Sequence, residues 1–175
     1  MKQFETEGDV RIGDNTQCGP GVRLLAGASG HIIIGRRCNL KAGVVINCYG
    51  GVVTLGDRVS VGEYTVIYGH GSVTIDDAVA IGPHCAISSQ EHIVGSMVAL
   101  RFAGERHART HIEFGAIVSA NCMVTAGVAI GNRTLVGAGS VVTRSLPPQT
   151  VAFGVPCKVI QEVSQDPMYG YRLTE

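Results

Sequence analysis

Residues 53–87 read VTLGDRVSVGEYTVIYGHGSVTIDDAVAIGPHCAI, and a branched aliphatic residue recurs in this stretch at every sixth position. A fixed internal period of this kind is the signature of a repeat architecture, in which short units stack along one axis. Two extra residues separate the first three repeats from the next three. The anchoring positions are Leu55, Val61, Ile67, Ile75, Ile81 and Ile87.

The same register continues on both sides of this stretch. Seventeen of its eighteen positions are Ile, Leu or Val, whereas these residues make up about a quarter of the chain. The period therefore extends over most of the sequence. The further anchors are Ile12, Cys18, Leu24, Ile34, Leu40, Ile46, Ile112, Val118, Val124, Ile130, Val136 and Val142.

Small residues accompany the anchors. Glycine often follows an anchor, and a small or branched residue often stands two positions before it. A short strand followed by a sharp turn makes one side of a triangular coil, and three sides close the coil. The pattern predicts an all-β fold, a single-stranded parallel β-helix of about six coils. The small inward positions include Cys38, Cys85 and Cys122, which we interpret as packing residues.

Composition excludes several classes of protein. The 175 residues suit one domain, and the net charge of zero argues against nucleic acid or an anionic membrane as the main partner. The N-terminal residues contain no apolar run typical of a secretory signal, and no later window predicts membrane insertion. We therefore expect a cytoplasmic protein, whose six cysteines are reduced because no CxxC pair occurs.

Residues 88–111, SSQEHIVGSMVALRFAGERHARTH, break the period of six. A long insertion in a regular scaffold is a common place for function, so we predict the active site here; the alternative is a surface loop with no task. His92 lies at the root of the insertion, and a histidine accepts a proton at neutral pH, as a general base must. We interpret His31, His70 and His84, which occur at turns, as structural or solvent-facing residues.

Basic residues gather in the second half of the insertion. They would make the far side of the loop suitable for binding phosphate groups, or they would be a solvated charged surface. These residues are Arg101, Arg106, Arg109, His107 and His111.

Three segments resemble a known family, the galactoside, maltose and polysaccharide O-acetyltransferases. They are VAIGPHCAISSQEH (residues 79–92), ANCMVTAGVAIGNRTLVGAGSVVTRSLPP (residues 120–148) and VAFGVPCKVI (residues 151–160), and the likeness extends over residues 10–160. The resemblance implies a left-handed β-helix and a homotrimer with active sites between subunits. It also implies transfer of an acetyl group from acetyl-CoA, as co-substrate, to a hydroxyl of a sugar or polysaccharide precursor, with His92 as the general base.

The resemblance also implies site residues. Relatives commonly place a Trp where this chain has Ile117, Glu113 and Ser119 stand where the repeat usually has Gly, and the sugar-binding Asn is missing around Glu63. These departures leave the acceptor open, so a nucleotide-linked amino sugar acetylated on nitrogen is an alternative. By position, the coenzyme contacts are Ile117, Ala120, Ala138, Thr143, Arg144 and Lys158, and the acceptor contacts are Glu63, Tyr64, Glu91 and Arg101.

The expected organisation is an N-terminal segment (1–9), a β-helix (10–145) carrying the loop 88–111, and a coenzyme-contacting and capping segment (146–175), in which a short helix would cover the last coil.

Two further alternative functions are known on the same scaffold. A γ-class carbonic anhydrase needs a pair of His five residues apart, which this chain lacks, so we expect no metal. A non-catalytic assembly subunit would have no need of the loop histidine.

Overall fold

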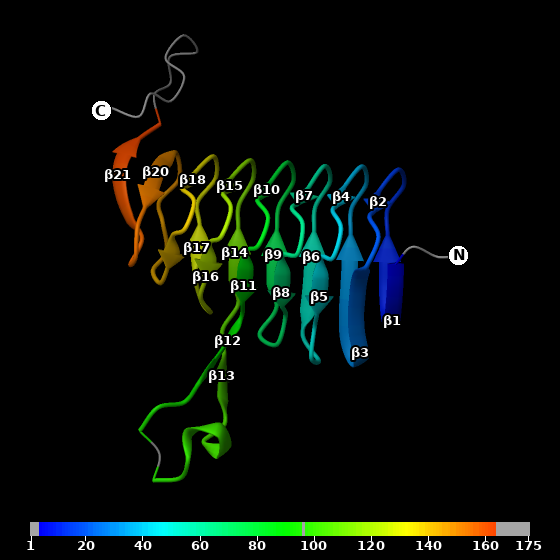
Figure 1. Cartoon of the computed structure of the whole chain (residues 1–175), viewed down its shortest axis with the longest axis horizontal. Coiled ribbons are helices and arrows are strands. Elements are labelled where there is room, and N and C mark those ends of the chain that lie inside the picture. The colour runs from blue at the N-terminus through cyan, green and yellow to red at the C-terminus, as the bar shows by residue number, and fades with distance from the viewer. Residues whose placement is uncertain (1–3, 96, 164–175) are drawn as a thin grey trace.

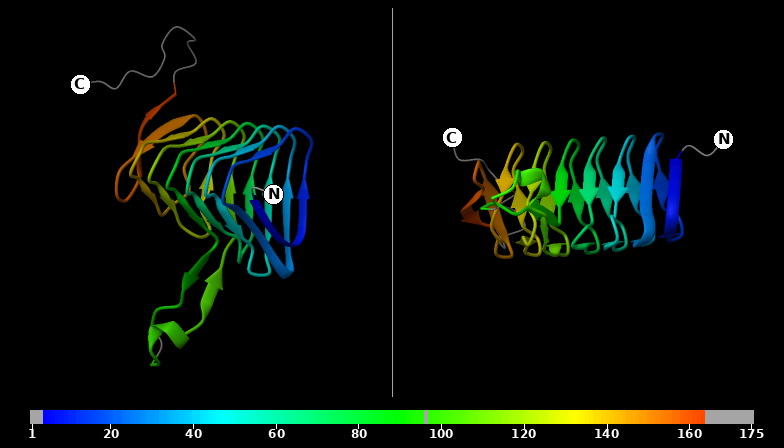
Figure 2. Two further views of the ribbon diagram at one scale, coloured as in Figure 1. Left: turned by 45° about the vertical axis from the view of Figure 1, so that its right-hand side comes forward. Right: turned by 90° about the horizontal axis from the view of Figure 1, so that it is seen from below.

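The structure is a computed structural model that describes residues 4–95 and 97–163. The chain winds into a stack of coils, a parallel β-solenoid, with β1 and β21 at opposite ends (Figure 1). Seen obliquely, the stack is an elongated prism from which a single arm projects (Figure 2). Across the described residues, no helix has the length and apolar character needed to cross a membrane.

The largest sheet has eleven strands and covers two sides of the prism, because the long strand β3 runs around a corner and pairs with β5 on one side and β6 on the other. Its strands are β1 (Phe4–Ile12), β3 (Val22–Ile34), β5 (Val45–Asn47), β6 (Val52–Leu55), β8 (Val66–Tyr68), β9 (Val73–Ile75), β11 (Ala86–Ser88), β14 (Thr110–Ile112), β16 (Met123–Val124), β17 (Ala129–Ile130) and β19 (Val141–Val142).

The second sheet forms the third side, and the arm carries the remaining elements. The sheet contains β2 (Gln17–Cys18), β4 (Asn39–Leu40), β7 (Ser60–Val61), β10 (Ala80–Ile81), β15 (Ile117–Val118), β18 (Leu135–Val136), β20 (Thr150–Phe153) and β21 (Lys158–Glu162); the arm contains β12 (Gln90–His92), the 3₁₀ helix η1 (Leu100–Phe102) and β13 (Glu105–His107).

The anchors stack on one another, as the period of six predicts. Val61 in β7 pairs with Leu40 on one side and Ile81 on the other. Sixteen of the eighteen anchors are buried; Ile12 and Cys18, which are more exposed, belong to the first coil of the stack. The all-β parallel fold and its apolar axis are therefore confirmed.

Glycine follows an anchor because successive coils come close together there. A Cβ on Gly62 would lie 2.4 Å from the carbonyl carbon of Gly82, and one on Gly82 would lie 2.6 Å from the amide nitrogen of Ala120. Where Glu113 replaces glycine, its carboxylate accepts the N–H of Asn132 at 2.9 Å and bridges two coils.

The solenoid is longer than the sequence predicted. Seven parallel strands, β2 to β20, stack in the second sheet, one more than the six coils expected. The stack begins with Phe4 in β1 instead of residue 10, and continues to Phe153, beyond the expected boundary at residue 145. At the C-terminal end, the small inner residues Ala152 and Cys157 hide the extra coil from a pattern search.

The two ends of the inserted segment also differ from the prediction. Ser88 still pairs with Tyr68, and Thr110 already pairs with Val73, so only residues 89–109 leave the stack. At the C-terminus, β21 lies antiparallel on β20 and covers its edge; only its last two residues belong to the segment 161–175 in which a short capping helix was expected. Residues 164–175 of the expected cap lie outside the described residues.

All six cysteines are free thiols, and Cys38, Cys85 and Cys122 are buried, which confirms their interpretation as packing residues. Cys48 is completely buried as well, and its Sγ donates to the carbonyl oxygen of His31 at 3.3 Å. Burial raises the pKa of the Cys48 thiol to about 11.

This raised pKa predicts that Cys48 is inert in the folded chain. Near pH 8 only ~0.1% of such thiols are ionised, and the thiolate is the reactive form. Iodoacetamide should leave Cys48 unlabelled in the native protein and label it after unfolding in urea, as followed by mass spectrometry of its peptide. Rapid labelling of Cys48 in the native protein would contradict the buried position.

Candidate functional site

His92 lies in a short antiparallel hairpin that projects from the solenoid where the period of six breaks (Figures 1 and 2). The hairpin consists of β12 and β13, and its register pairs His92 with Glu105 and Glu91 with Arg106. Successive side chains of a strand point to opposite faces. His92 and Glu105 therefore share one face of the hairpin, and Glu91 and Arg106 share the other.

Hydrogen bonds to the solenoid fix the root of the hairpin. The buried hydroxyl of Ser89 donates to the carbonyl oxygen of Tyr68 at 2.8 Å and accepts the N–H of Gly71 at 2.9 Å. The N–H of Ala108 donates to the carbonyl oxygen of Ser89 at 2.9 Å. β12 begins directly after Ser89, and β13 ends directly before Ala108. These bonds therefore hold the side chains near the root in position.

Three imidazoles surround the carboxylate of Glu105. One oxygen lies 4.0 Å from Nδ1 of His92, and the other lies 3.5 Å from Nε2 of His107 and 3.9 Å from Nε2 of His70. The His92 ring is well exposed, with 60% of its side chain accessible, so it can reach an external substrate. The solenoid and both strands of the hairpin thus contribute to one cluster, which we call the Glu105 cluster.

His70 is the buried member of the Glu105 cluster. From the sequence it was predicted at a turn, and its contact with the site was not predicted. Its side chain is only 13% exposed, and its ring stacks on Tyr49 with centroids 4.1 Å apart. Desolvation by burial lowers the pKa of His70, although Glu105 opposes this, so the ring is neutral at pH 7. His31 and His84 match the prediction, since His31 contacts Asp9 and His84 stacks on exposed Tyr64.

The predicted basic surface on the far side of the loop is not formed. Arg106 pairs with Glu91, Arg109 donates to Oγ1 of Thr74 at 2.9 Å, and His111 contacts Asp76 at 2.9 Å on the solenoid. The antiparallel register brings His107 back to the root. Of the five residues, Arg101 alone belongs to the outer part of the arm, in η1, with its guanidinium 5.9 Å from the Phe102 ring centre.

The residues predicted to contact the coenzyme lie at two corners of one chain. Ala120 and Ala138 are at successive turns of one corner, where the carbonyl oxygen of Ala120 accepts the N–H of Gly139 at 2.9 Å. Thr143 and Arg144 directly follow β19, which lies two strands beyond β11 in the same column of strands, and the hairpin departs after β11.

The side chains at these predicted positions are open to an approaching ligand. Ile117 points outward from β15 and is 46% exposed, and Lys158 is exposed in β21. The small side chain of Ala138 is also exposed. Exposed cations beside small side chains fit a ligand that carries phosphate groups, but a single chain does not bring all of these positions to His92.

The predicted acceptor residues are also divided. Glu63 and Tyr64 occupy the same corner as Ala120, since the carbonyl oxygen of Glu63 accepts the N–H of His84 and that of Pro83 accepts the N–H of Asn121. Glu91 faces away from His92 on the hairpin, and Arg101 is in η1. Within one chain, these residues therefore do not form a pocket around the imidazole.

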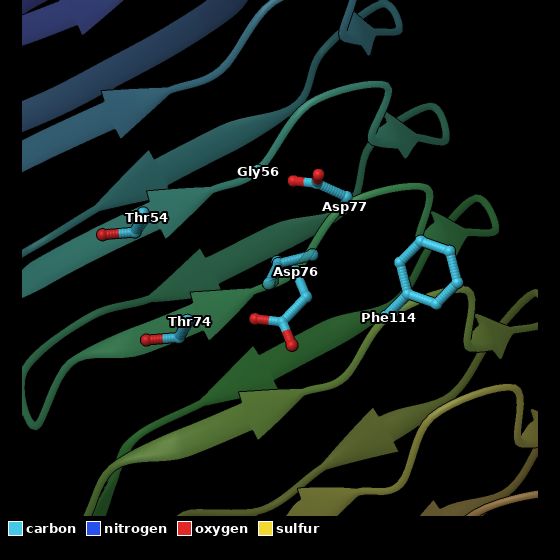
Figure 3. A pocket seen from close by; sticks show the side chains of 7 residues that line it. Thr54, Gly56, Thr74, Asp76, Asp77 and Phe114 are labelled. Carbon is cyan, nitrogen blue, oxygen red and sulfur yellow. The ribbon is translucent and has the colours of Figure 1, made fainter.

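A surface hollow of about 320 Å³ lies elsewhere, over β6, β9 and β14 (Figure 3). Thr54, Thr74 and the ring of Phe114 border it, together with the carboxylate of Asp76, which is already occupied by His111. None of the predicted site residues lines this hollow. Among residues 4–95 and 97–163, no group of three or more His, Cys, Asp or Glu side chains has the arrangement needed to hold a metal ion.

Comparison with known proteins supports the repeat assignment. The family model of the bacterial transferase hexapeptide, which describes six repeats, matches residues 109–144. Galactoside O-acetyltransferase of Escherichia coli K12 is 33% identical over 124 residues, which cover 70% of this chain and 60% of that protein. The enzyme of the same name from Lactococcus lactis is 28% identical over 138 residues, covering 79% and 66%. The chain thus spans about two thirds or less of the length of these relatives.

Solved structures share the fold over nearly the whole chain. A galactoside acetyltransferase in complex with coenzyme A aligns with a TM-score of 0.70 and 26% identity, covering 97% of this chain and 70% of that one. The N-acyltransferase AntD from Bacillus cereus, in complex with dTDP and coenzyme A, aligns with a TM-score of 0.78 and 20% identity, covering 89% and 84%. The repeat register, the stacked coils and these similarities agree: residues 109–144 match the bacterial transferase hexapeptide family, and the chain shares the stacked-coil fold of these acyltransferases.

Proposed function

We propose that this chain is an acetyl-CoA-dependent O-acetyltransferase whose acceptor is a hydroxyl of a sugar or polysaccharide precursor. The observation that carries the proposal is an exposed imidazole, His92, held beside a carboxylate at the anchored root of the hairpin. The galactoside O-acetyltransferases, which share up to 33% of their aligned residues with this chain, support the choice of reaction and of a sugar hydroxyl.

His92 is the general base in this proposal. The acceptor oxygen attacks the thioester carbonyl carbon while a ring nitrogen of His92 takes the hydroxyl proton. When the C–S bond breaks, the imidazolium returns that proton to the departing sulfur. An ester and free CoA result, and His92 ends in its starting state.

A homotrimer would complete the site. Ala120 and Ala138 lie on a different corner from His92, so a channel containing both would need residues of a neighbouring copy. The arm also exposes apolar side chains, among them Val94, Met97 and Phe102, for which a neighbouring subunit is a suitable contact. Both observations favour active sites between subunits, as the family resemblance implies.

Acceptor screening tests the proposed reaction. Release of the CoA thiol from acetyl-CoA should depend on the acceptor, and simple sugars or oligosaccharides should be acetylated on oxygen, as identified by mass spectrometry. The panel should include nucleotide-linked amino sugars, because AntD, which binds dTDP, shares the fold. N-acetylation of such a compound alone would replace the proposed acceptor, and no acceptor-dependent release with the whole panel would contradict the reaction.

Coenzyme affinity tests the predicted donor side. Lys158 is exposed in β21, and its ammonium would contact a CoA phosphate. We expect Lys158→Ala to raise the Kd of CoA about threefold to tenfold, and less at high salt, as measured by isothermal titration calorimetry. Lys41→Ala is the matched control. Lys41 is an exposed lysine that directly follows β4 near the N-terminal end of the stack, so its substitution should have no effect. Equal effects of the two substitutions would contradict the predicted contact.

A further inference from the structure

Glu105 lies opposite His92 in the hairpin and projects from the same face. The register of β12 and β13 pairs the two residues directly, and the nearest approach of their side chains is between Nδ1 of His92 and Oε1 of Glu105, at 4.0 Å. Glu91, the neighbour of His92 in sequence, faces the other way and pairs with Arg106. The carboxylate that accompanies the proposed base thus comes from the opposite strand.

Glu105 is itself held in place by its other oxygen. His107, from its own strand, and His70, from the turn after β8, approach Oε2 at 3.5 Å and 3.9 Å through their Nε2 atoms. His70 stacks on Tyr49, and burial lowers its pKa, which favours the neutral ring. The carboxylate therefore lies within 4.0 Å of a ring nitrogen of each of the three imidazoles.

A fixed carboxylate beside one ring nitrogen decides which nitrogen is free. A neutral imidazole carries its proton on the nitrogen that faces an acceptor and leaves the other nitrogen as a base. For His92 the nitrogen that faces Glu105 is Nδ1. The distance of 4.0 Å exceeds a hydrogen bond, but contacts of this kind are often long in a free enzyme and shorten when the substrate binds.

We propose that Glu105 is the positioning residue of His92: its carboxylate holds the Nδ1–H tautomer, so that Nε2 faces the acceptor hydroxyl as the base. The proposal rests on the function proposed above. In the transfer step Nε2 takes the hydroxyl proton, and the imidazolium lies beside a negative carboxylate. Glu105 keeps its charge throughout and takes no proton, and Nε2 later gives the proton to the departing sulfur.

The tautomer can be measured on the unaltered protein. Two-bond ¹H–¹⁵N correlation spectra of the histidine rings distinguish a protonated Nδ1 from a protonated Nε2, and His92→Gln identifies the His92 signals by their loss. We expect neutral His92 to carry its proton on Nδ1. A predominant Nε2–H form would overturn the proposal without any variant of Glu105.

Substitution of Glu105 gives a second test, with the same substitution at a remote carboxylate as its control. Glu105→Gln keeps the shape, and its amide N–H would donate to Nδ1 and favour the wrong tautomer. We expect kcat to fall about tenfold to hundredfold, with the KM for acetyl-CoA unchanged and the proton of His92 moved to Nε2. Glu7→Gln, which makes the same change at an exposed carboxylate in β1, should alter neither kcat nor the ring signals.

The outcomes separate this inference from the proposed function. If His92→Ala is inactive while Glu105→Gln retains full kcat and the Nδ1–H signal, His92 remains the base and Glu105 is not its positioning residue. If His92→Ala retains full activity, the proposed function fails, whatever Glu105→Gln does. An equal loss of kcat in Glu7→Gln and Glu105→Gln would show that the loss does not depend on a carboxylate beside His92 and would also overturn the inference.

Discussion

Replacement of His92 by alanine should lower acetyl transfer at least a hundredfold. General base catalysis contributes about a hundredfold to ten-thousandfold, and a hundredfold loss corresponds to about 2.7 kcal/mol of transition-state stabilisation. Since 60% of the His92 side chain is exposed, the fold should survive the change. The measurement is kcat/KM for release of the CoA thiol in the presence of a saturating acceptor.

Binding and a second histidine provide the controls for this variant. His92→Ala should bind CoA with the Kd of the unaltered protein, which would show that the loss concerns the chemical step. His31→Ala removes an imidazole near the N-terminal end of the stack, where it contacts Asp9, and should retain full activity. Unchanged turnover in His92→Ala would remove this residue from the mechanism.

Substitution of Ile32 by aspartate should unfold the solenoid. Ile32 in β3 has no exposed surface, and its truncation alone would cost about 2–5 kcal/mol. An unpaired buried carboxylate adds several kcal/mol more, which together approaches the total of about 5–15 kcal/mol that stabilises a typical domain. We expect loss of the β-sheet signal in far-UV circular dichroism, or a midpoint in urea unfolding far below that of the unaltered chain.

The neighbouring residue is a strict control for this substitution. Ile33 has the same side chain and lies in the same strand, but it points outward and is 40% exposed. Ile33→Asp should therefore leave the urea midpoint nearly unchanged. Similar destabilisation by both substitutions would contradict the inward and outward alternation on which the anchor register depends.

The fold was predictable because the anchors carry most of the information. A coil needs a branched side chain at each inner position and a small residue where it turns. From Leu24 to Val142 the sequence meets that requirement with a step of six inside each coil. The last coil was missed because Ala152 and Cys157 occupy its inner positions in place of branched aliphatic residues. The first strand was missed because it adds to β3 before the period begins.

The candidate site was predictable only at its starting point. The broken period located His92, but the partners of His92 depend on the register of a hairpin that has no repeat to reveal it. Glu105 is thirteen residues further along the chain, and the antiparallel pairing brings it back. His70 could have been suspected, because Tyr68 pairs with Ser88 and the coil register therefore places residue 70 at the start of the insertion.

The basic surface of the loop was predicted from its composition. Composition does not show which residues an antiparallel hairpin pairs with one another. Arg106 and Arg109 were expected to face a common ligand, yet one meets a carboxylate across the hairpin and the other reaches the solenoid. Both side chains therefore already have partners within the chain, namely Glu91 and Thr74. The remaining predicted phosphate contacts are Arg144 and Lys158, which are exposed near the C-terminal coils.

The structure of this chain crystallised with CoA tests the central claim most directly. The account predicts that the CoA sulfur lies beside Nε2 of His92, in a cleft between two copies of the chain, with the phosphates toward Arg144 or Lys158. A sulfur bound at a corner remote from His92, or a coenzyme that touches only the hollow over β6, β9 and β14, would contradict it.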